Sequence, residues 1–389
     1  MREQGFSVIE MAVAAALTLT ISAVALALLD PVQVGFAAQP EAADMQQRLR
    51  VAAGALYNDL AMAGAGASRG GNSGSLGRYF APVLPYRQGT SHDDPPGSFR
   101  TNAITLMFVP PTVAQTTLAT AGPVAVSADI GVNIVAGCPS GDPLCGFKQG
   151  MSLLLFDAAA SYDIFTIADV QPATLSIERT GGSLTRTDYA PDETTVVEGR
   201  TVVYSLKSDP TAGTYQLVSS EGGGADVPVV DHLVALTFEY YGDAQPPALI
   251  GSAQETTYGP RPPALDEQIP THGYPAGESC TFTIDPLSGL QAPRLDVLGP
   301  AGTLVPLAAA RLTDGPWCPD EANVNRWDAD LLRIRKIGVT LRIQAANAAL
   351  RGPAGVLFAH GGTSRNGLRW LPDLQVRFEV APRNLAFGK

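Results

Sequence analysis

The sequence is poor in the residues that enzymes use for chemistry. Histidine occurs four times and cysteine four times in 389 residues. No G-x-S-x-G, H-E-x-x-H or G-x-x-x-x-G-K-[ST] motif occurs, so the chain offers no nucleophile elbow, zinc-protease helix or phosphate-binding loop. An EF-hand series is also absent, and Asp93, Asp94 and Asp142 are expected to lie in solvated turns. We therefore expect no enzyme, no cofactor and no metal site. The histidines, none close to another in sequence, are His92, His232, His272 and His360.

Basic residues are scarce as well. The 26 lysines and arginines are outnumbered by 37 aspartates and glutamates, and the net charge is −11. An acidic chain with scattered basic residues lacks the basic patch of nucleic-acid-binding proteins, so no nucleic-acid partner is predicted. Glycine (40) and proline (31) are frequent, and helical patterns are few beyond the N-terminus. This composition favours strands joined by long loops.

An apolar run at residues 6–29 is the most distinctive stretch. It holds one charged side chain, Glu10. A helix of this length rises about 36 Å, enough to cross a bilayer core of roughly 30 Å. A carboxylate in the apolar part of such a helix costs at least a few kcal/mol. If the chain is cut after Gly5, the new α-amine of Phe6 lies one helical turn from Glu10. In a bundle, the amine of one subunit could then pair with the carboxylate of its neighbour.

Gly5-Phe6-Ser7-Val8-Ile9-Glu10 before a small-residue-rich apolar helix resembles the class III signal of type IV prepilins and type II secretion pseudopilins. The resemblance implies cleavage between Gly5 and Phe6 by a prepilin peptidase, N-methylation of Phe6, and a role for Glu10 in registering subunits. A generic signal anchor with a chance glutamate is the alternative. We expect a leader at 1–5, a membrane-spanning polymerisation helix at 6–29, a kinked amphipathic continuation at 30–66 and a β-rich head at 67–389.

Asp30-Pro31 is expected to kink or break the helix, because proline lacks an amide donor and clashes with the preceding turn. A second helical pattern begins near Glu41 and ends at Gly64-Ala65-Gly66. The segment that closes it, Leu56 to Gly64, resembles the L-x-x-D-L-x-x-A-G pattern of PilW-type minor pilins. The apolar stripe of this second half comprises Met45, Leu49, Ala52, Leu56, Leu60 and Ala63.

The remainder reads as an antiparallel β-rich head, which makes the fold class α+β. Strands are predicted at 103–109, 151–156, 162–170, 173–178, 227–241, 280–284, 337–343 and 374–380, and a hairpin at 201–206 and 214–219. Residues 66–100, 112–150 and much of 242–330 are expected to be loops. The β segments at 151–241 and 333–385 resemble PilW-type heads weakly.

The four cysteines are expected to form disulfides, since an exported head meets an oxidising compartment. Three pairings are open. The neighbour pairing is favoured, Cys138 with Cys145 and Cys280 with Cys318. A zinc site is the rival, but no C-x-x-C motif or histidine at ligand spacing accompanies these residues.

The resemblance implies a minor type IV pilus subunit of the PilW kind, acting in pilus assembly or initiation near the tip. A head of about 320 residues is too bulky to repeat at every position of a packed fibre. Implied partners are the prepilin peptidase and methyltransferase, other major and minor pilins, and the bacterial inner membrane before the chain reaches the pilus and cell surface. The N-terminus would be cytoplasmic and the head periplasmic. Alternatives are a J-type secretion pseudopilin and a membrane-tethered adhesin or binding head.

Overall fold

A computed structural model describes the chain in ten stretches. For residues 26–37 and 180 it describes the backbone but not the side chains. These stretches are residues 7–89, 93–119, 129–180, 189–211, 213–222, 224–249, 257–267, 273–320, 323–365 and 370–386. The chain divides into two compact units. The first unit comprises Met1–Arg50 and Arg342–Gln375, and the second comprises Val51–Leu341 and Val376–Lys389.

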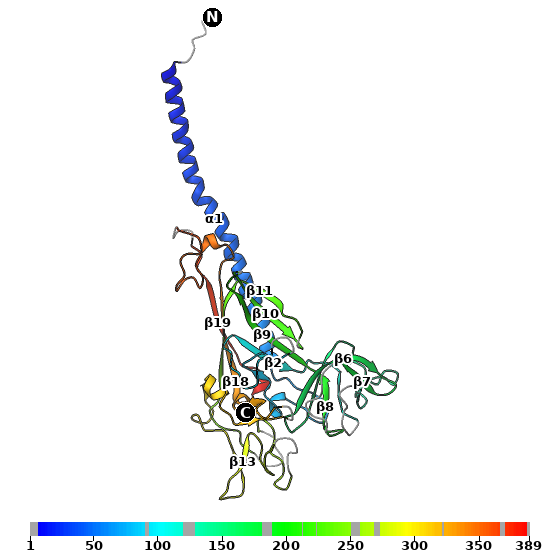
Figure 1. Cartoon of the computed structure of the whole chain (residues 1–389). Coiled ribbons are helices and arrows are strands. Elements are labelled where there is room, and N and C mark those ends of the chain that lie inside the picture. Colours follow the sequence, from blue (N-terminus) through cyan, green and yellow to red (C-terminus); the bar gives the residue numbers. More distant parts are fainter. Residues whose placement is uncertain are drawn as a thin grey trace. The chain divides into compact units, whose positions relative to one another are not determined.

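One long helix, α1 (Val8–Met62, 55 residues), runs through both sequence regions that were predicted to be helical (Figure 1). The sequence predicted a kink or a break at Asp30-Pro31, and the break is wrong, because the backbone is helical across these residues. A proline removes one backbone hydrogen bond of the ladder and favours a bend at a cost of about 3 kcal/mol. The helix-forming runs on both sides continue past it, so the element persists.

Helix α1 ends where the sequence predicted. Gly64 adopts a φ of +76°, a conformation that favours glycine. Its amide donates to the carbonyl of Met107 at 2.9 Å, and its carbonyl accepts from Leu76 at 3.0 Å. A Cβ at this position would lie 2.6 Å from the Leu385 side chain. The glycine therefore both ends the helix and allows close packing after it.

The first unit also contains the segment between β18 (Ile334–Ile343) and β19 (Leu374–Val380), which includes the short helix η4 (Ala348–Leu350). The Glu41 carboxylate of α1 accepts the amide of Ala346 at 2.5 Å. Arg342 forms an ion pair with the buried Asp373 at 2.9 Å. The Glu41 hydrogen bond joins the first part of α1 to the segment at 344–373, and the Arg342–Asp373 ion pair joins the two ends of that segment.

A five-stranded antiparallel sheet lies next to the last turns of α1 in the second unit. Its strand order is β1-β2-β9-β10-β11. The Tyr204 hydroxyl of β9 donates to the Asp59 carboxylate of α1 at 2.7 Å. The predicted hairpin is present as β9 and β10, with Thr214 opposite Asp209. The strand bounds are Val83–Leu84, Ala103–Phe108, Arg200–Asp209, Thr214–Glu221 and Val227–Asp231.

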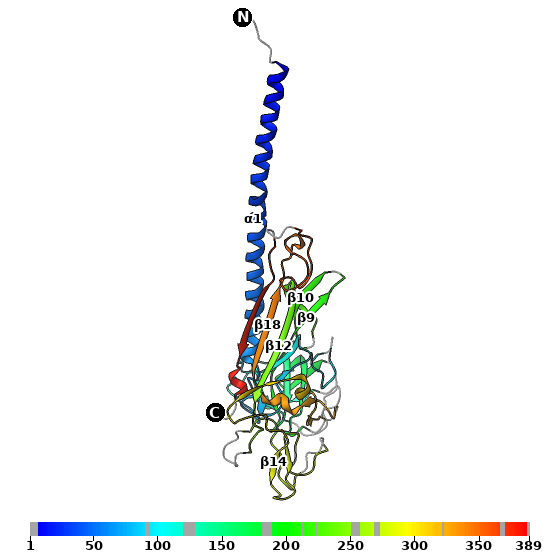
Figure 2. The same ribbon diagram turned by 90° about the vertical axis from the view of Figure 1, so that its left-hand side faces the viewer.

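A four-stranded sheet has the order β15-β12-β18-β19, and Figure 2 shows β12 and β18 side by side. The new strands are β15 (Leu304–Leu307) and β12 (Leu233–Asp243). The single strand predicted at 227–241 is wrong. His232 has a φ of +59°, and the strands before and after it belong to different sheets. A histidine tolerates this left-handed conformation better than the β-branched residues around it would.

A six-stranded sheet has the order β3-β8-β5-β6-β7-β4 and encloses its own apolar core. Leu153, Leu155, Ile177 and Val196 are fully buried in this core. The predicted strands at 151–156, 162–170 and 173–178 are found here with small shifts. The strand bounds are Gln115–Thr117, Thr195–Glu198, Ser152–Phe156, Tyr162–Gln171, Ser176–Thr180 and Ile130–Gly131. The loop predicted at 112–150 therefore contains two short edge strands.

Two small hairpins complete the second unit, β13 with β14 and β16 with β17. Their bounds are Phe282–Ile284, Gln291–Pro293, Trp317–Cys318 and Trp327–Asp328, and the short helices are Leu76–Arg78, Ala309–Leu312 (η2), Ala329–Arg333 (η3) and Arg383–Leu385. An N-terminal apolar helix followed by antiparallel sheets confirms the α+β class.

Candidate functional site

The first part of α1 is apolar on every side and exposed on every side. Val8–Ala25 has a mean hydropathy of 2.0, and no residue of this stretch is buried within the chain. By length and composition it meets the criteria for a membrane span, which an N-terminal signal sequence also meets. Its large exposed side chains are Val8, Ile9, Met11, Val13, Leu17, Leu19, Ile21 and Val24. An exposed apolar surface of this kind is typical of helices that lie in lipid or pack against other apolar helices.

Ser7 and Glu10 begin the helix as a capping box. The Glu10 carboxylate accepts the Ser7 amide at 2.9 Å, and the Ser7 hydroxyl accepts the Glu10 amide at 3.2 Å. This reciprocal arrangement satisfies two amides that a helix start leaves unpaired. The positive end of the helix dipole also favours a carboxylate here. Sequence analysis missed the role of Ser7, although the S-x-x-E spacing before an apolar run signals it.

Polar side chains further along the exposed part are satisfied within the helix. The Thr18 hydroxyl donates to the Ala14 carbonyl at 2.7 Å, and the Thr20 hydroxyl donates to the Ala16 carbonyl at 2.6 Å. A hydroxyl bonded in this way does not add an unpaired polar group in an apolar medium. Glu10 is the only ionisable side chain in the Val8–Ala25 stretch.

The two processing residues, Gly5 and Phe6, lie outside the described residues. The second half of α1 is described, and its apolar stripe is buried. Met45, Ala52, Leu56, Leu60 and Ala63 are each 0% exposed, whereas Leu49 is half-buried. In the L-x-x-D-L-x-x-A-G segment the two leucines and the alanine point into the core, Asp59 accepts from Tyr204, and Gly64 ends the helix. The motif thus describes how this helix is fixed to β9.

All four cysteines form disulfides, in the neighbour pairing that the sequence favoured. Cys138 bonds Cys145 and closes a short loop next to the core of the six-stranded sheet. Cys280 bonds Cys318 and joins the β13 region to the β16–β17 hairpin. Each bond closes a loop of the chain, and such covalent links restrict the unfolded state.

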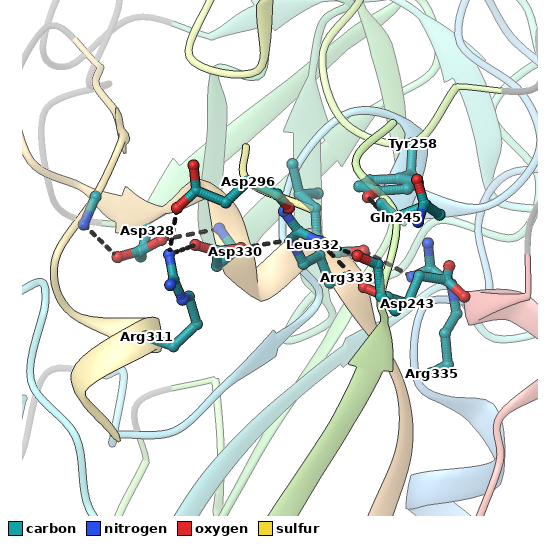
Figure 3. Close-up of polar contacts among 12 residues, drawn as sticks. Asp243, Gln245, Tyr258, Asp296, Arg311, Asp328, Asp330, Leu332, Arg333 and Arg335 are labelled. Atoms are coloured by element: carbon teal, nitrogen blue, oxygen red, sulfur yellow. Dashed lines mark hydrogen bonds and ion pairs between the residues drawn. The ribbon is translucent and has the colours of Figure 1, made fainter. Parts of the chain in front are cut away.

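A buried charge network lies at the η2 and η3 end of the four-stranded sheet (Figure 3). The Asp330 carboxylate lies 2.5 Å from the Arg333 guanidinium and 3.9 Å from that of Arg311. Arg333 also donates to the carbonyl of Asp243 at 3.1 Å. The Asp243 carboxylate pairs with Arg335 at 2.7 Å.

The carboxylates of this network are strongly affected by burial. Burial raises the pKa of Asp328 to about 6, although the amides of Asp330 and Gly315 donate to it. Burial likewise raises the pKa of Asp330 to about 7, against the opposing charge of Arg333. The side chains of Asp330 and Arg333 are 1% and 0% exposed, so no substrate can reach them. We interpret the network as structural.

The histidines do not gather into a site. His232 lies at the β11–β12 break, and His360 lies 3.2 Å from the Gln344 side chain. Burial and the nearby Arg351 lower the pKa of His360. His92 and His272 lie outside the described residues. Within the described stretches, no group of three or more His, Cys, Asp or Glu side chains could hold a metal ion.

A groove of about 950 Å³ opens on the second unit. Apolar residues form much of its lining, including Pro262, Pro263, Leu265 and Leu290. A concave, mainly apolar surface of this size is typical of ligand sites.

We find no protein-family model, no curated protein and no solved structure that matches this chain. The likeness to prepilins thus rests on the sequence: mainly on residues 5–10, the apolar helix after them and the segment at 56–64, and weakly on the β segments at 151–241 and 333–385.

Proposed function

We propose that this protein is a minor subunit of a type IV pilus, of the PilW kind, that is cleaved after Gly5, methylated on Phe6 and assembled through the first part of α1. One observation carries the proposal. A single helix is apolar and wholly exposed over Val8–Ala25, yet its stripe is buried from Met45 to Ala63. One part is thus fixed to the chain's own sheets, and the other is left for lipid or neighbouring helices.

Glu10 is the residue that distinguishes a subunit from a simple anchor in this proposal. In the isolated chain its carboxylate accepts the Ser7 amide. In a fibre, the methylated amine of a neighbouring Phe6 would supply a positive partner, and an ion pair in a low-dielectric bundle is stronger than one in water. This pair would set the axial register of each subunit against the next.

Minor status follows from bulk. The head at 67–389 holds several sheets and long loops, and a packed fibre that repeated it at each position would have to accommodate all of them. A subunit placed rarely, near the tip, meets no such restriction. A J-type secretion pseudopilin would use the same anchor chemistry.

A membrane-tethered binding head is the second candidate function, favoured by the apolar groove that contains Pro262 and Leu265. In that case the anchor would display the head without polymerising.

The deciding experiment is the mass of the N-terminal peptide of protein taken from native membranes. A peptide that begins with methylated Phe6 would support the pilus subunit. A peptide that begins with Met1 would refute processing and favour the tethered head.

A further inference from the structure

The chain is acidic, yet residues 344–372 contain no acidic residue, a feature shared by two other stretches, 60–92 and 95–128. Residues 344–372 hold Arg351, Arg365, Arg369 and His360 and no aspartate or glutamate, whereas the whole chain has a net charge of −11. Among described residues, no ion pair is found for the side chains of Arg351 and Arg365, and Arg365 is exposed. This segment therefore offers a local positive surface.

The same segment presents an apolar turn to the medium. Gly355 and Phe358 exchange backbone hydrogen bonds of 2.8 and 3.2 Å, which makes Val356 and Leu357 the corner residues of a tight turn. Val356 is 94% exposed and Leu357 is 52% exposed. Turn corners are usually glycine, asparagine, aspartate, serine or proline, because these residues suit the backbone and the solvent. A valine and a leucine at an exposed corner indicate an apolar partner.

Hydrogen bonds, an ion pair and an aromatic contact fix the backbone of the turn at 355–358. The Arg342 guanidinium donates to the Val356 carbonyl at 2.9 Å and pairs with Asp373, whose carboxylate also accepts the Ala359 amide at 2.7 Å. The Phe358 ring is 2% exposed and packs edge-on against Trp370, with centroids 5.7 Å apart. The two apolar corner residues are thus presented on a fixed support and lose little conformational entropy on docking.

The segment belongs to the same compact unit as the candidate membrane span. The Glu41–Ala346 hydrogen bond attaches it to α1 twelve residues after Leu29, which is about 18 Å of helix. The headgroup layer extends roughly 5 to 7 Å beyond the hydrocarbon core. The usual helix tilt of about 0 to 40° brings one side of α1 closer to that layer.

We propose that the turn at 355–358, together with Arg351 and Arg365, docks onto the anionic phospholipid surface of the membrane that α1 enters. Val356 and Leu357 enter the boundary between headgroups and acyl chains, and the two guanidinium groups bind lipid phosphates. Exposed apolar side chains flanked by arginine, with a tryptophan beside them, are the composition of membrane-interface segments. The contact holds the first unit against the membrane before the subunit leaves the bilayer.

The inference depends on α1 spanning the membrane and not on assembly into a fibre. Three variants of the full chain, each with one added cysteine, test both points. The added cysteine is the free thiol to be labelled, because all four native cysteines are in disulfides. Val356→Cys reports on the turn. Leu17→Cys reports on the span. Leu287→Cys, at a residue 96% exposed in the second unit, is the matched control. Each is labelled with a nitrobenzoxadiazole dye, whose emission shifts to shorter wavelength in an apolar environment, and is reconstituted into vesicles.

Vesicles of phosphatidylcholine alone are compared with vesicles that also contain phosphatidylglycerol. We expect the label at Val356 to shift and brighten in the anionic vesicles, the label at Leu17 to shift in both, and the label at Leu287 to stay unchanged. An inserted Leu17 label with an unshifted Val356 label would overturn the docking surface while leaving the span intact. An unshifted Leu17 label would refute the span itself.

Charge dependence identifies the headgroup as the partner. Replacing Arg351 and Arg365 by glutamine should lower the ratio of docked to undocked turn by about fivefold for each arginine, the value of roughly 1 kcal/mol per basic residue near an anionic surface. Raising the salt concentration should act in the same direction. An equal shift in neutral and anionic vesicles, unaffected by these substitutions, would contradict the proposed lipid specificity.

Discussion

Two roles are considered for the Glu10 carboxylate, and three substitutions separate their contributions. As a helix cap it accepts the Ser7 amide at 2.9 Å, and as a registering residue it would pair with the amine of a neighbouring subunit. Glu10→Gln keeps a side chain that can complete a capping box but removes the charge. Ser7→Ala removes the hydroxyl half of the box and keeps the charge. Glu10→Val removes both functions of the glutamate.

The magnitudes of the two roles differ enough to decide between them. Loss of a cap costs about 0.5 to 2 kcal/mol of helix stability. Loss of one partner from a buried ion pair costs about 3 to 5 kcal/mol, because the remaining charge is left without compensation. If registration dominates, Glu10→Gln and Glu10→Val should both weaken incorporation by roughly 10² to 10⁴-fold. Ser7→Ala should reduce it by about thirtyfold at most.

Incorporation is measured as the amount of each variant in sheared fibres, relative to the amount of processed protein in the membrane. The second quantity matters because Glu10→Val is expected to leave cleavage after Gly5 intact. The registration argument would be refuted by Glu10→Gln entering fibres as well as the unaltered chain while Ser7→Ala does not. That pattern would make Glu10 a helix cap.

Three further predictions concern processing and the buried network. Gly5→Ala should leave the head folded and block cleavage, and efficient cleavage seen by N-terminal mass would argue against a prepilin peptidase site. Arg333→Met should lower the free energy of unfolding by about 3 to 5 kcal/mol, because Arg333 is fully buried. The matched control Arg311→Met should lower it by about 1 kcal/mol or less, because Arg311 is 33% exposed. Equal losses for the two variants in denaturant titrations would contradict this. Burial raises the pKa values of Asp328 and Asp330 to about 6 and 7 from 3.8, so the native state retains protons that the unfolded state has released. Stability should fall as the pH rises from about 4 to about 7, by at most about 1.4 kcal/mol per pH unit for each group, and a denaturation midpoint that rises over this range would count against the assignment.

Local patterns predicted the strands that have one buried and one wet face. The strand at 374–380 was predicted with the observed bounds, because its side chains alternate between half-buried and exposed. The hairpin of β9 and β10 followed from the turn cluster between its strands. In both cases the signal lies within about ten residues, so neighbouring residues alone determine it.

Predictions failed where a backbone choice depends on distant partners. The apolar alternation at 227–241 is continuous, and only the separation of β11 and β12 into two sheets requires the left-handed conformation of His232. In the same way, Pro31 destabilises the helix locally, but the proline alone does not determine whether the helix continues beyond it. Sheet assignment is a long-range property, and a single sequence does not encode it as a local pattern.

The buried network shows the same limit for charge. Four charged side chains lie within eight residues of the sequence, and such a cluster is typical of a solvated surface. They are Asp328, Asp330, Arg333 and Arg335. Their burial follows from partners such as Asp243, far away in sequence, which neutralise the arginines once β12 and β18 lie together. No periodicity records this pairing.

At the N-terminus, by contrast, the local sequence contains the signal for the helix cap, a serine three residues before a glutamate at the start of an apolar run. A lone carboxylate in an apolar helix costs a few kcal/mol, which suggested a partner in another subunit. The Ser7-x-x-Glu10 spacing supplies a partner within the same helix, and both hydrogen bonds of the box are formed. In the proposed membrane-bound state, the cap lowers the cost of the charge. It occupies one carboxylate oxygen with a single neutral amide, and a carboxylate has further acceptor sites for a cationic donor. A neighbouring amine can therefore add to the capped Glu10 without first breaking the cap.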